Sequence, residues 1–477
     1  MYMMKGLINL SVKNKIVCDN QILEYGNEDT LLEVLCHNGY SASFCAGKGI
    51  CGKCKVRFME APPLPTQADR RVLSPEELRK GIRLACQIPM KSLKDIQIET
   101  LFGENKAPIL ASFQNIPMDF GSKEKIAPGC FAIVDLGSTT VVMQLIDRKN
   151  GKIIATERFM NPQRIYGADV ITRMQASLEG KKQELQQLIR EALIHSLKSV
   201  EEQTGKQIER VYLAGNTTMV HLFMGYPIDQ MTRYPFTPWN KDMIKEEIEE
   251  YSFTILPAIS AFVGGDIVSG AFALKMKPNS LLIDLGTNGE ILLCAGEKMY
   301  ATATAAGPAF ENAVTAEVVG SDMIKVLAEL LDKGIVDETG LLDEDRIEKD
   351  LRYVNQQFVR EMQKAKAAIR VGIELLLKNA GIEATGLETV YLAGGFGKGL
   401  DVKSAVRIGL FPEELCHKVV AVGNSVLAGL YKFGMEASLG NEGKCVEMVG
   451  KIATLTNEVN LAAQPEFNER YVARLNF

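Results

Sequence analysis

Residues 131–147, FAIVDLGSTTVVMQLID, decide the fold of most of this chain, because the same pattern occurs twice. Its counterpart is LLIDLGTNGEILLCAG at residues 281–296. In each copy an apolar run ends in Asp-Leu-Gly, small polar residues follow, and a second apolar run begins. Short apolar runs separated by glycine-containing turns are typical of paired strands. The pattern therefore predicts the same strand, turn and strand unit in two places.

The similarity continues downstream of both copies. A long amphipathic segment is followed each time by the identical pentapeptide VYLAG. The segments are EALIHSLKSVEEQTG at 191–205 and AAIRVGIELLLKNAG at 367–381, and VYLAG lies at 211–215 and 390–394. Matching strings in the same order indicate an internal duplication. We therefore expect an α/β region with two similar lobes, about 130–275 and about 276–477.

Each Asp-Leu-Gly turn carries groups that can bind phosphate. A carboxylate at a strand end can hold magnesium through water, and N–H groups of a glycine-containing turn can face a phosphate. One such turn is more often an ordinary strand end, but two in duplicated lobes would hold phosphates from both sides. Glycines after the second VYLAG offer a flat surface for a purine and ribose. The candidate residues are Asp135, Gly137, Ser138, Thr139 and Thr140, then Asp284, Gly286, Thr287, Asn288 and Gly289, and finally Gly394, Gly395 and Phe396.

In this order the three segments resemble the phosphate 1, phosphate 2 and adenosine motifs of the actin, sugar kinase and heat-shock chaperone superfamily. The resemblance implies a two-lobed, actin-like (ribonuclease H-like) ATPase over residues 130–477 that binds ATP with Mg2+. It also implies that Asp135 and Asp284 position the magnesium and that Glu290 orients water. Asp169 and Asp266, in polar turns, are candidates for supporting or partner-contacting roles, with ordinary turn capping as the alternative.

Residues 1–103 are predicted to form a smaller α+β domain. Two capping boxes begin its helices, Thr30 with Glu33 before LLEVLCHNG and Ser74 with Glu77 further on. Alternating apolar residues predict strands, with a turn in KNKIVCDN between the first two. The expected strands are LINLSV at 7–12, QILEYG at 21–26, KCKVRF at 53–58 and DIQIET at 95–100, and the expected turn is 13–20.

A linker is expected over residues 104–129. The sequence GENKAPILASFQNIPMDFGSKEKIAPG, which begins at Gly103, has no sustained period and is rich in proline and turn residues. Such a composition is typical of a connecting segment. The small domain is therefore expected to be tethered to the two lobes.

Four of the ten cysteines have ligand spacing. Cys45, Cys51 and Cys54 follow C-x5-C-x2-C, and Cys86 lies further along in LACQIP. Thiolates in a glycine-rich loop, together with a distant fourth, can converge on one iron–sulfur centre. Zinc sites usually have two C-x2-C pairs, and only one is present here. A zinc site and unrelated cysteines remain the alternatives. The other six, expected to be structural, are Cys18, Cys36, Cys130, Cys294, Cys416 and Cys445.

The cysteine loop, GKGICGKC at 47–54, also fits two nucleotide-binding patterns. It matches G-x-G-x-x-G, and it matches a P-loop that ends in cysteine where serine or threonine is required. Both motifs need an apolar strand before the loop and a helix after it, whereas SASFCA precedes and the alternating KCKVRFME follows. We therefore assign the glycines to the cysteine site, where they allow N–H groups to approach sulfur. Lys48 and Lys53 either flank that site functionally or are ordinary solvated charges.

The cysteine spacing resembles ferredoxins of the plant and adrenodoxin type, whose β-grasp fold carries a 2Fe-2S cluster. A ferredoxin-like domain joined to this ATPase resembles the reductive activators of corrinoid proteins. Further strings extend the resemblance along nearly the whole chain. They are NPQRIYGADVITRM at 161–174, AFVGGDIVSG at 261–270, AAGPAFE at 305–311, LAGGFGKGLDVKSAVRIGLFP at 392–412 and VGNSVLAG at 422–429. Two departures are expected, namely the absence of the middle domain of longer relatives and a shortened segment after residue 311.

The resemblance implies that the protein passes an electron from its 2Fe-2S cluster to the cob(II) form of a corrinoid protein, with ATP, and so restores cob(I) for methyl transfer. Implied partners are a corrinoid protein of a methyltransferase system and a low-potential reductant, with a homodimer also expected. The alternatives are a redox-sensing Fe-S ATPase that controls a partner, an ATP-driven electron donor to another low-potential enzyme, and a small-molecule kinase.

Composition limits the remaining classes of function. A length of 477 residues with 46% hydrophobic and 24% charged residues predicts a globular chain of several domains. The net charge of -5 and pI near 5.7 argue against a dedicated nucleic-acid binder. The chain has neither a long uncharged apolar run nor a signal peptide in its first residues. We expect a cytoplasmic protein without membrane contact, in which cysteines are ligands or buried residues rather than disulfides.

Overall fold

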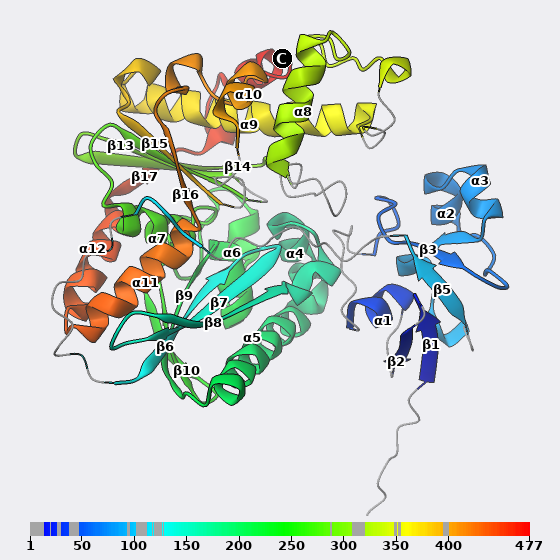
Figure 1. Cartoon of the computed structure of the whole chain (residues 1–477), viewed down its shortest axis with the longest axis horizontal. Helices are drawn as coiled ribbons and strands as arrows, with labels where there is room; N and C mark the ends of the chain where they lie inside the picture. The colour runs from blue at the N-terminus through cyan, green and yellow to red at the C-terminus, as the bar shows by residue number, and fades with distance from the viewer. Residues whose placement is uncertain are drawn as a thin grey trace, which may run out of the picture. The chain divides into compact units, whose positions relative to one another are not determined.

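The computed structural model describes residues 14–19, 21–25, 30–37, 47–92, 96–101, 112–116, 118, 126, 128–286, 289–307, 320–347, 351, 354–394 and 400–477. The chain divides into two compact units (Figure 1). The first contains residues 1–106 and 162–176, and the second contains residues 107–161 and 177–477. Among the described residues, every helix is too short or too polar to traverse a lipid bilayer.

The first unit is built on a mixed five-stranded sheet with the order β2-β1-β5-β3-β4. Strands β1 and β5 are parallel, and the other neighbours are antiparallel. The strands are β1 (Asn14–Cys18), β2 (Gln21–Tyr25), β3 (Lys55–Phe58), β4 (Ile82–Leu84) and β5 (Gln97–Thr100), and the helices are α1 (Leu31–His37), α2 (Gln67–Val72), α3 (Pro75–Arg79) and α4 (Val170–Ala176). Residues of α1 such as Leu31 and Leu35 share a buried core with Val56 of β3 and Leu84 of β4.

The segment KNKIVCDN, which the sequence predicts as a turn, instead contains strand β1. Ile16 pairs with Leu23 of β2, and Val17 pairs with Gln97 of β5. Pairing on both edges therefore overrides the turn-forming residues at the ends of the segment. The strands expected at 21–26, 53–58 and 95–100 are confirmed as β2, β3 and β5, while the strand expected at 7–12 lies outside the described residues.

Both predicted capping boxes are confirmed. Thr30 N donates to Glu33 Oε2 at 3.0 Å, and Glu33 N donates to Thr30 Oγ1 at 3.3 Å. At the start of α3, Ser74 N donates to Glu77 Oε2 at 2.7 Å and Glu77 N donates to Ser74 Oγ at 3.2 Å. Each box satisfies two N–H groups that a helix start leaves without an intrahelical partner.

The second unit contains two six-stranded sheets. Their orders are β10-β11-β9-β6-β7-β8 and β16-β15-β12-β13-β14-β17. The first comprises β6 (Cys130–Leu136), β7 (Thr140–Asp147), β8 (Ile153–Met160), β9 (Ile208–Gly215), β10 (Ile244–Ile248) and β11 (Tyr251–Ile255). The second comprises β12 (Ser280–Leu285), β13 (Gly289–Ala295), β14 (Lys298–Thr304), β15 (Thr389–Ala393), β16 (Val419–Gly423) and β17 (Thr456–Glu458). The helices are α5 (Lys182–Thr204), α6 (Thr217–Met224), α7 (Gly265–Leu274), α8 (Gly320–Asp332), α9 (Gln356–Ala380), α10 (Val402–Arg407), α11 (Ser425–Ser438), α12 (Glu442–Leu455) and α13 (Phe467–Ala473).

The two sheets confirm the internal duplication strand by strand. In the first lobe β6, β7 and β8 are successively antiparallel, and β9 lies parallel beside β6. Strands β12, β13, β14 and β15 repeat this arrangement in the second lobe. Asp135 is opposite Ala214 of the first VYLAG, and Asp284 is opposite Ala393 of the second. The two Asp-Leu-Gly turns therefore occupy equivalent places.

Helices α7 and α11 lie side by side between the two sheets (Figure 1). A Cβ on Gly429 would lie 2.1 Å from Ser269 O, so no larger residue fits there without separating the helices. Ser269 Oγ also donates to Val426 O at 2.8 Å. This close packing brings the N-terminal ends of both helices to the strand ends that carry Asp135 and Asp284.

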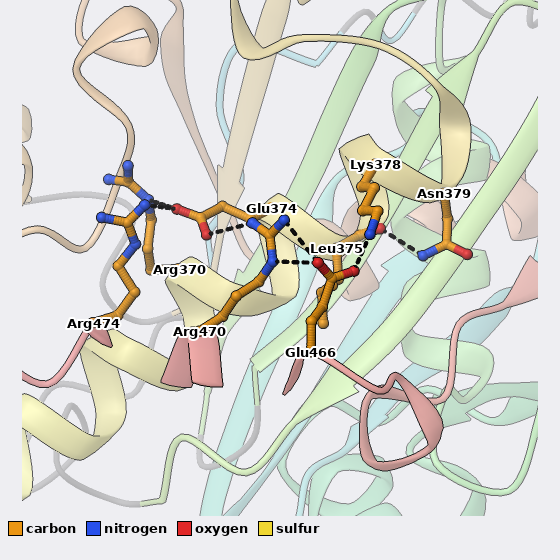
Figure 2. A network of polar contacts seen from close by, with 8 residues as sticks. All are labelled: Arg370, Glu374, Leu375, Lys378, Asn379, Glu466, Arg470 and Arg474. Atoms are coloured by element: carbon orange, nitrogen blue, oxygen red, sulfur yellow. Dashed lines mark hydrogen bonds and ion pairs between the residues drawn. The ribbon is translucent and has the colours of Figure 1, made fainter. Parts of the chain in front are cut away.

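Helix α13 is attached to α9 by charged side chains. Figure 2 shows Glu374 of α9 among three arginines. Its carboxylate accepts from Arg370 Nε at 2.7 Å, and it lies 3.3 Å from Arg470 Nη1 and 2.8 Å from Arg474 Nη2. Because the Glu374 side chain is 12% exposed, these contacts are shielded from water more than ordinary surface pairs.

Candidate functional site

Four carboxyl groups from both lobes gather where β6, β12, β13 and α7 meet. We call Asp135, Asp266, Asp284 and Glu290 the acidic site. Asp284 and Glu290 are opposite each other on the antiparallel strands β12 and β13. Asp266, the second residue of α7, is close enough to act electrostatically on Asp135 and Glu290. The packing thus brings together the predicted Asp135, Asp284 and Glu290 and adds Asp266.

Three carboxyl groups of the acidic site, those of Asp135, Asp266 and Glu290, have raised pKa values. Burial raises the pKa of Asp135 to about 7, and the charge of Asp266 adds to this rise. Burial raises the pKa of Asp266 to about 6, although nearby backbone N–H groups oppose the shift. Burial, followed by the charges of Asp266 and Asp284, raises the pKa of Glu290 well above its usual value. A bound cation would remove this mutual repulsion.

Two asparagines that the sequence analysis did not identify hold these carboxyl groups. Asn424 Nδ2 donates to Asp135 Oδ2 at 2.7 Å, and Asn216 Nδ2 donates to Glu290 Oε1 at 3.3 Å. Each asparagine is also the N-cap of a helix, α11 and α6 respectively. The available signal was an asparagine directly after a glycine-ended strand, in VYLAGN and VAVGN.

The first predicted phosphate turn is tightly packed. A Cβ on Gly137 would lie 2.4 Å from Thr140 O, which explains the need for glycine. Asn161 Nδ2 donates to Gly137 O at 2.9 Å, and Asn161 N donates to Thr139 O at 2.9 Å. Ser138 and Thr139 are each 9% exposed. The turn is therefore held by Asn161, the residue that follows β8.

The second turn and the glycine surface are described only in part. Thr287, Asn288, Gly395 and Phe396 lie outside the described residues. Gly394 has φ +87°, and a Cβ there would lie 2.4 Å from Leu285 O and 2.7 Å from Asp284 Oδ1. Gly394 is therefore next to the acidic site. A Cβ on Gly289 would lie 2.1 Å from Ile369 Cδ1 of α9, so this glycine is required for helix packing.

The cysteine site of the first unit is described at three of its four predicted ligands. Cys54 and Cys86 are buried, Cys51 is partly exposed, and Cys45 lies outside the described residues. A hydrogen bond with Cys86, together with burial, raises the pKa of the Cys54 thiol far above its usual value. The two sulfurs are therefore neighbours. A 2Fe-2S cluster takes four thiolates shared between two irons, so such a pair fits one iron.

The loop around these cysteines requires its glycines. Gly47, Gly49 and Gly52 have φ of +74°, +64° and +67°. A Cβ on Gly49 would lie 2.8 Å from the side chains of both Ala68 and Gln87. Gln87 Nε2 donates to Gly47 O at 2.6 Å and to Cys86 Sγ at 3.4 Å. Gln87, which the sequence analysis passed over, thus ties the loop to the predicted fourth ligand.

The remaining predicted residues have contacts or exposure that ordinary structural roles explain. Among the described residues, no group of three or more His, Cys, Asp and Glu side chains is placed to hold a metal ion directly. Asp169 Oδ1 accepts from Thr172 N at 2.9 Å, which is the turn-capping alternative. Lys48 and Lys53 are exposed. Of the cysteines expected to be structural, Cys18, Cys130, Cys294 and Cys445 are buried, Cys416 is partly exposed, and the side chain of Cys36 lies outside the described residues.

Family models match three consecutive regions of the chain. The 2Fe-2S iron-sulfur cluster binding domain matches residues 16–91. The RACo middle region matches residues 131–279. The C-terminal domain of RACo, the ASKHA domain, matches residues 278–317 and 312–477. The expected fold class, a ferredoxin-like domain followed by an actin-like ATPase fold, is confirmed.

Two relatives that match most of the chain have names that refer to corrinoid activation or to a corrinoid protein. The chain is 29% identical over 480 residues to the corrinoid activation enzyme RamQ of Eubacterium limosum, covering 84% of this chain and 79% of the relative. It is 22% identical to the Co(II) methylated amine-specific corrinoid protein reductase of Methanosarcina barkeri, covering 72% and 76% respectively. A solved structure of a reductive activator for corrinoid,iron-sulfur protein matches with TM-score 0.66 at 22% identity over 98% of each chain, which shows a shared fold.

These matches correct one expectation. The sequence analysis expected the middle domain of longer relatives to be absent, but the RACo middle region matches residues 131–279, which include the first lobe of the duplication. The expected shortening after residue 311 lies outside the described residues. The sequence is similar to that of a corrinoid activation enzyme, and the fold is similar to that of a reductive activator. With a 2Fe-2S domain, a RACo middle region and a RACo ASKHA domain in this order, the chain belongs to the RACo family.

Proposed function

We propose that this protein is an ATP-dependent reductive activator of a corrinoid protein of a methyltransferase system. When bound, the 2Fe-2S cluster supplies one electron, which reduces cob(II) to cob(I) in the partner while the cluster is oxidised. ATP is hydrolysed to ADP and phosphate, and a low-potential reductant supplies a further electron that reduces the cluster again. One observation carries the proposal: a neighbouring cysteine pair suited to a cluster and a buried acidic site suited to a magnesium-nucleotide occur on one chain.

The need for ATP follows from the direction of the electron transfer. Plant-type 2Fe-2S clusters have potentials near roughly -400 mV, from which reduction of cob(II) is uphill. Each ~59 mV of mismatch disfavours a one-electron transfer about tenfold. ATP offsets this only if its binding or hydrolysis changes the affinity of the ASKHA region for one state of the corrinoid protein.

The residues of the acidic site have distinct roles in this proposal. Asp135 and Asp284 would hold Mg2+ through water, as carboxylates at strand ends can. Glu290 would orient the attacking water, and a bound cation would offset the nearby charges that, with burial, raise its pKa. The glycine and hydroxyl residues of both turns bind phosphates, and Gly394, Gly395 and Phe396 contact the adenosine.

The decisive experiment is rapid mixing of the reduced, cluster-loaded protein with a cob(II) corrinoid protein. We expect the cob(I) absorption spectrum to form with Mg-ATP and not with Mg-ADP or without nucleotide. Asp284→Asn should lower the rate of cob(I) formation by roughly 100-fold or more, because Mg2+ loses a strand-end carboxylate. Asp343→Asn, an exposed residue of the same lobe, is the matched control and should match the wild type.

Other outcomes identify the alternatives. If cob(I) never forms but ATP hydrolysis follows the oxidation state of the cluster, the chain is a redox-sensing ATPase. If electrons reach a different low-potential enzyme only with ATP, the donor role is right and the corrinoid partner is wrong.

A further inference from the structure

Asn216 and Asn424 each form a hydrogen bond from one lobe to a carboxyl group of the other lobe. Asn216 belongs to the first lobe and donates to Glu290 of the second lobe. Asn424 belongs to the second lobe and donates to Asp135 of the first lobe. The two hydrogen bonds therefore run in opposite directions across the same junction and end on two carboxyl groups of the acidic site.

The amide of each asparagine is fixed by its second contact. Asn216 Oδ1 accepts from Thr218 N at 3.0 Å, and Asn424 Oδ1 accepts from Leu427 N at 2.8 Å. With the oxygen used as a helix cap, only the NH2 group can face the carboxyl group. Asn216 Nδ2 makes a further hydrogen bond to Phe262 O at 3.2 Å. Both asparagines are also largely buried, at 6% and 8% exposure.

We propose that Asn216 and Asn424 are a pair of interlobe positioning residues that set Glu290 and Asp135 for Mg-nucleotide chemistry only when the lobes are together. This inference rests on the proposed ATPase function. Each amide N–H fixes the position of the carboxyl oxygen that it contacts. If the lobes separate, both donors leave with the opposite lobe, so Glu290 and Asp135 lose these contacts together.

Both carboxyl groups also lie near other acidic side chains. Asp266 of α7 acts on Asp135, and Asp266 together with Asp284 of β12 acts on Glu290. Asn424 and Asn216 are the side chains that oppose burial and repulsion at these two groups. The two amides are therefore expected to hold each carboxyl group in place against its acidic neighbours.

The test uses the full-length, cluster-loaded protein with substitutions that preserve the helix caps. Asn424→Ser and Asn216→Ser keep a capping oxygen but are too short to reach the carboxyl groups. Asn424→Asp keeps the cap and places a carboxylate beside Asp135. We expect each serine variant to lower the kcat of ATP hydrolysis roughly 10- to 100-fold, in line with the loss of a hydrogen bond to a charged group. The KM for ATP should change by less than kcat, and kcat should fall furthest in Asn424→Asp, because a second carboxylate then lies against Asp135.

The matched control is Asn355, which caps α9 by accepting from Phe358 N at 2.9 Å and is exposed. Asn355→Ser and Asn355→Asp should leave kcat and KM unchanged. The double variant Asn216→Ser with Asn424→Ser should lose less than the product of the single losses, because both contacts act on one arrangement of the lobes.

Two results overturn the inference. One is a kcat in the serine variants that equals that of the Asn355 variants, and the other is a double variant whose loss equals the product of the single losses. Failure of the proposed function is different, because it would appear as a wild-type protein that neither binds nor hydrolyses Mg-ATP.

Discussion

Asp135, Asp266 and Glu290 are buried near one another, and each has a pKa raised mainly by burial. In the unfolded chain the carboxyl group of Asp135 titrates near 3.8, whereas in the folded protein it titrates at about 7. Between these values the folded state binds more protons than the unfolded state, so stability falls as the pH rises through this range. The acidic site is therefore maintained at a cost to folding.

Asp135→Asn should relieve part of this cost. We expect the variant to be more stable than the wild type by about 1–3 kcal/mol at pH 8, with the difference disappearing near pH 4. Thermal unfolding without nucleotide at several pH values measures it. Asp147→Asn, at the end of neighbouring β7, is the control. Parallel curves of stability against pH for Asp135→Asn and the wild type would contradict the prediction.

Gln87 allows a second test at this scale, in the cysteine site. An N–H donor to a ligand sulfur stabilises the more negative, reduced cluster. Gln87→Leu removes the donor to Cys86 Sγ and should lower the reduction potential by roughly 20–60 mV, the equivalent of one hydrogen bond. A redox titration followed by EPR measures the shift. Gln67→Leu, an exposed position in the same unit, should leave the potential unchanged, and an unmoved potential in both variants would refute the role of Gln87.

Some residues of the acidic site could be predicted from the sequence, and the asparagines that contact them could not. Asp135 and Asp284 could be located because the repeat puts both at the same point of a strand. Asn216 and Asn424 could not, since their partners are 74 and 289 residues away along the chain and belong to the opposite lobe.

At the level of elements, capping chemistry was the most reliable guide. The starts of α1 and α3 are set by side chains three residues apart, which the sequence shows directly. Strand β1 was predicted wrongly because its identity depends on β2 and β5, and β5 lies far along the chain.

The attachment of α13 to α9 predicts a clear effect on stability. Glu374→Gln leaves three arginines without their shared carboxylate and should lower the free energy of unfolding by about 1–3 kcal/mol. The midpoint of urea unfolding measures this change. Glu361→Gln, on the same helix, replaces a carboxylate that accepts a hydrogen bond from Gln357 and should shift the midpoint far less. Equal shifts would show that the network in Figure 2 adds little.

For the whole molecule, the order of regions could be predicted from spacing and repetition. The middle region was missed because the same residues also fit a simpler description as the first half of a duplication. Hydrophobic pattern and turn chemistry are alike in both descriptions, so physical reasoning on one sequence cannot separate them.

The division into two units predicts that the two chemistries can be separated. Cys86→Ser should abolish the visible and EPR signals of the 2Fe-2S cluster and the formation of cob(I), because one thiolate ligand is lost. ATP hydrolysis should persist, since the acidic site belongs entirely to the second unit. Cys416→Ser should keep both activities. A Cys86→Ser protein that retains the cluster spectrum would show that this residue is not a ligand.

The placement of β17 has a consequence for the making of the protein. The five-stranded sheet of the first unit is complete once Thr100 has been synthesised, whereas the last sheet of the second unit waits for Thr456–Glu458. At roughly 5–20 residues per second, ribosomes need tens of seconds to cover that interval. The nascent chain can therefore receive its iron and sulfide before its second lobe has closed, so that the electron carrier matures ahead of the machinery that consumes ATP.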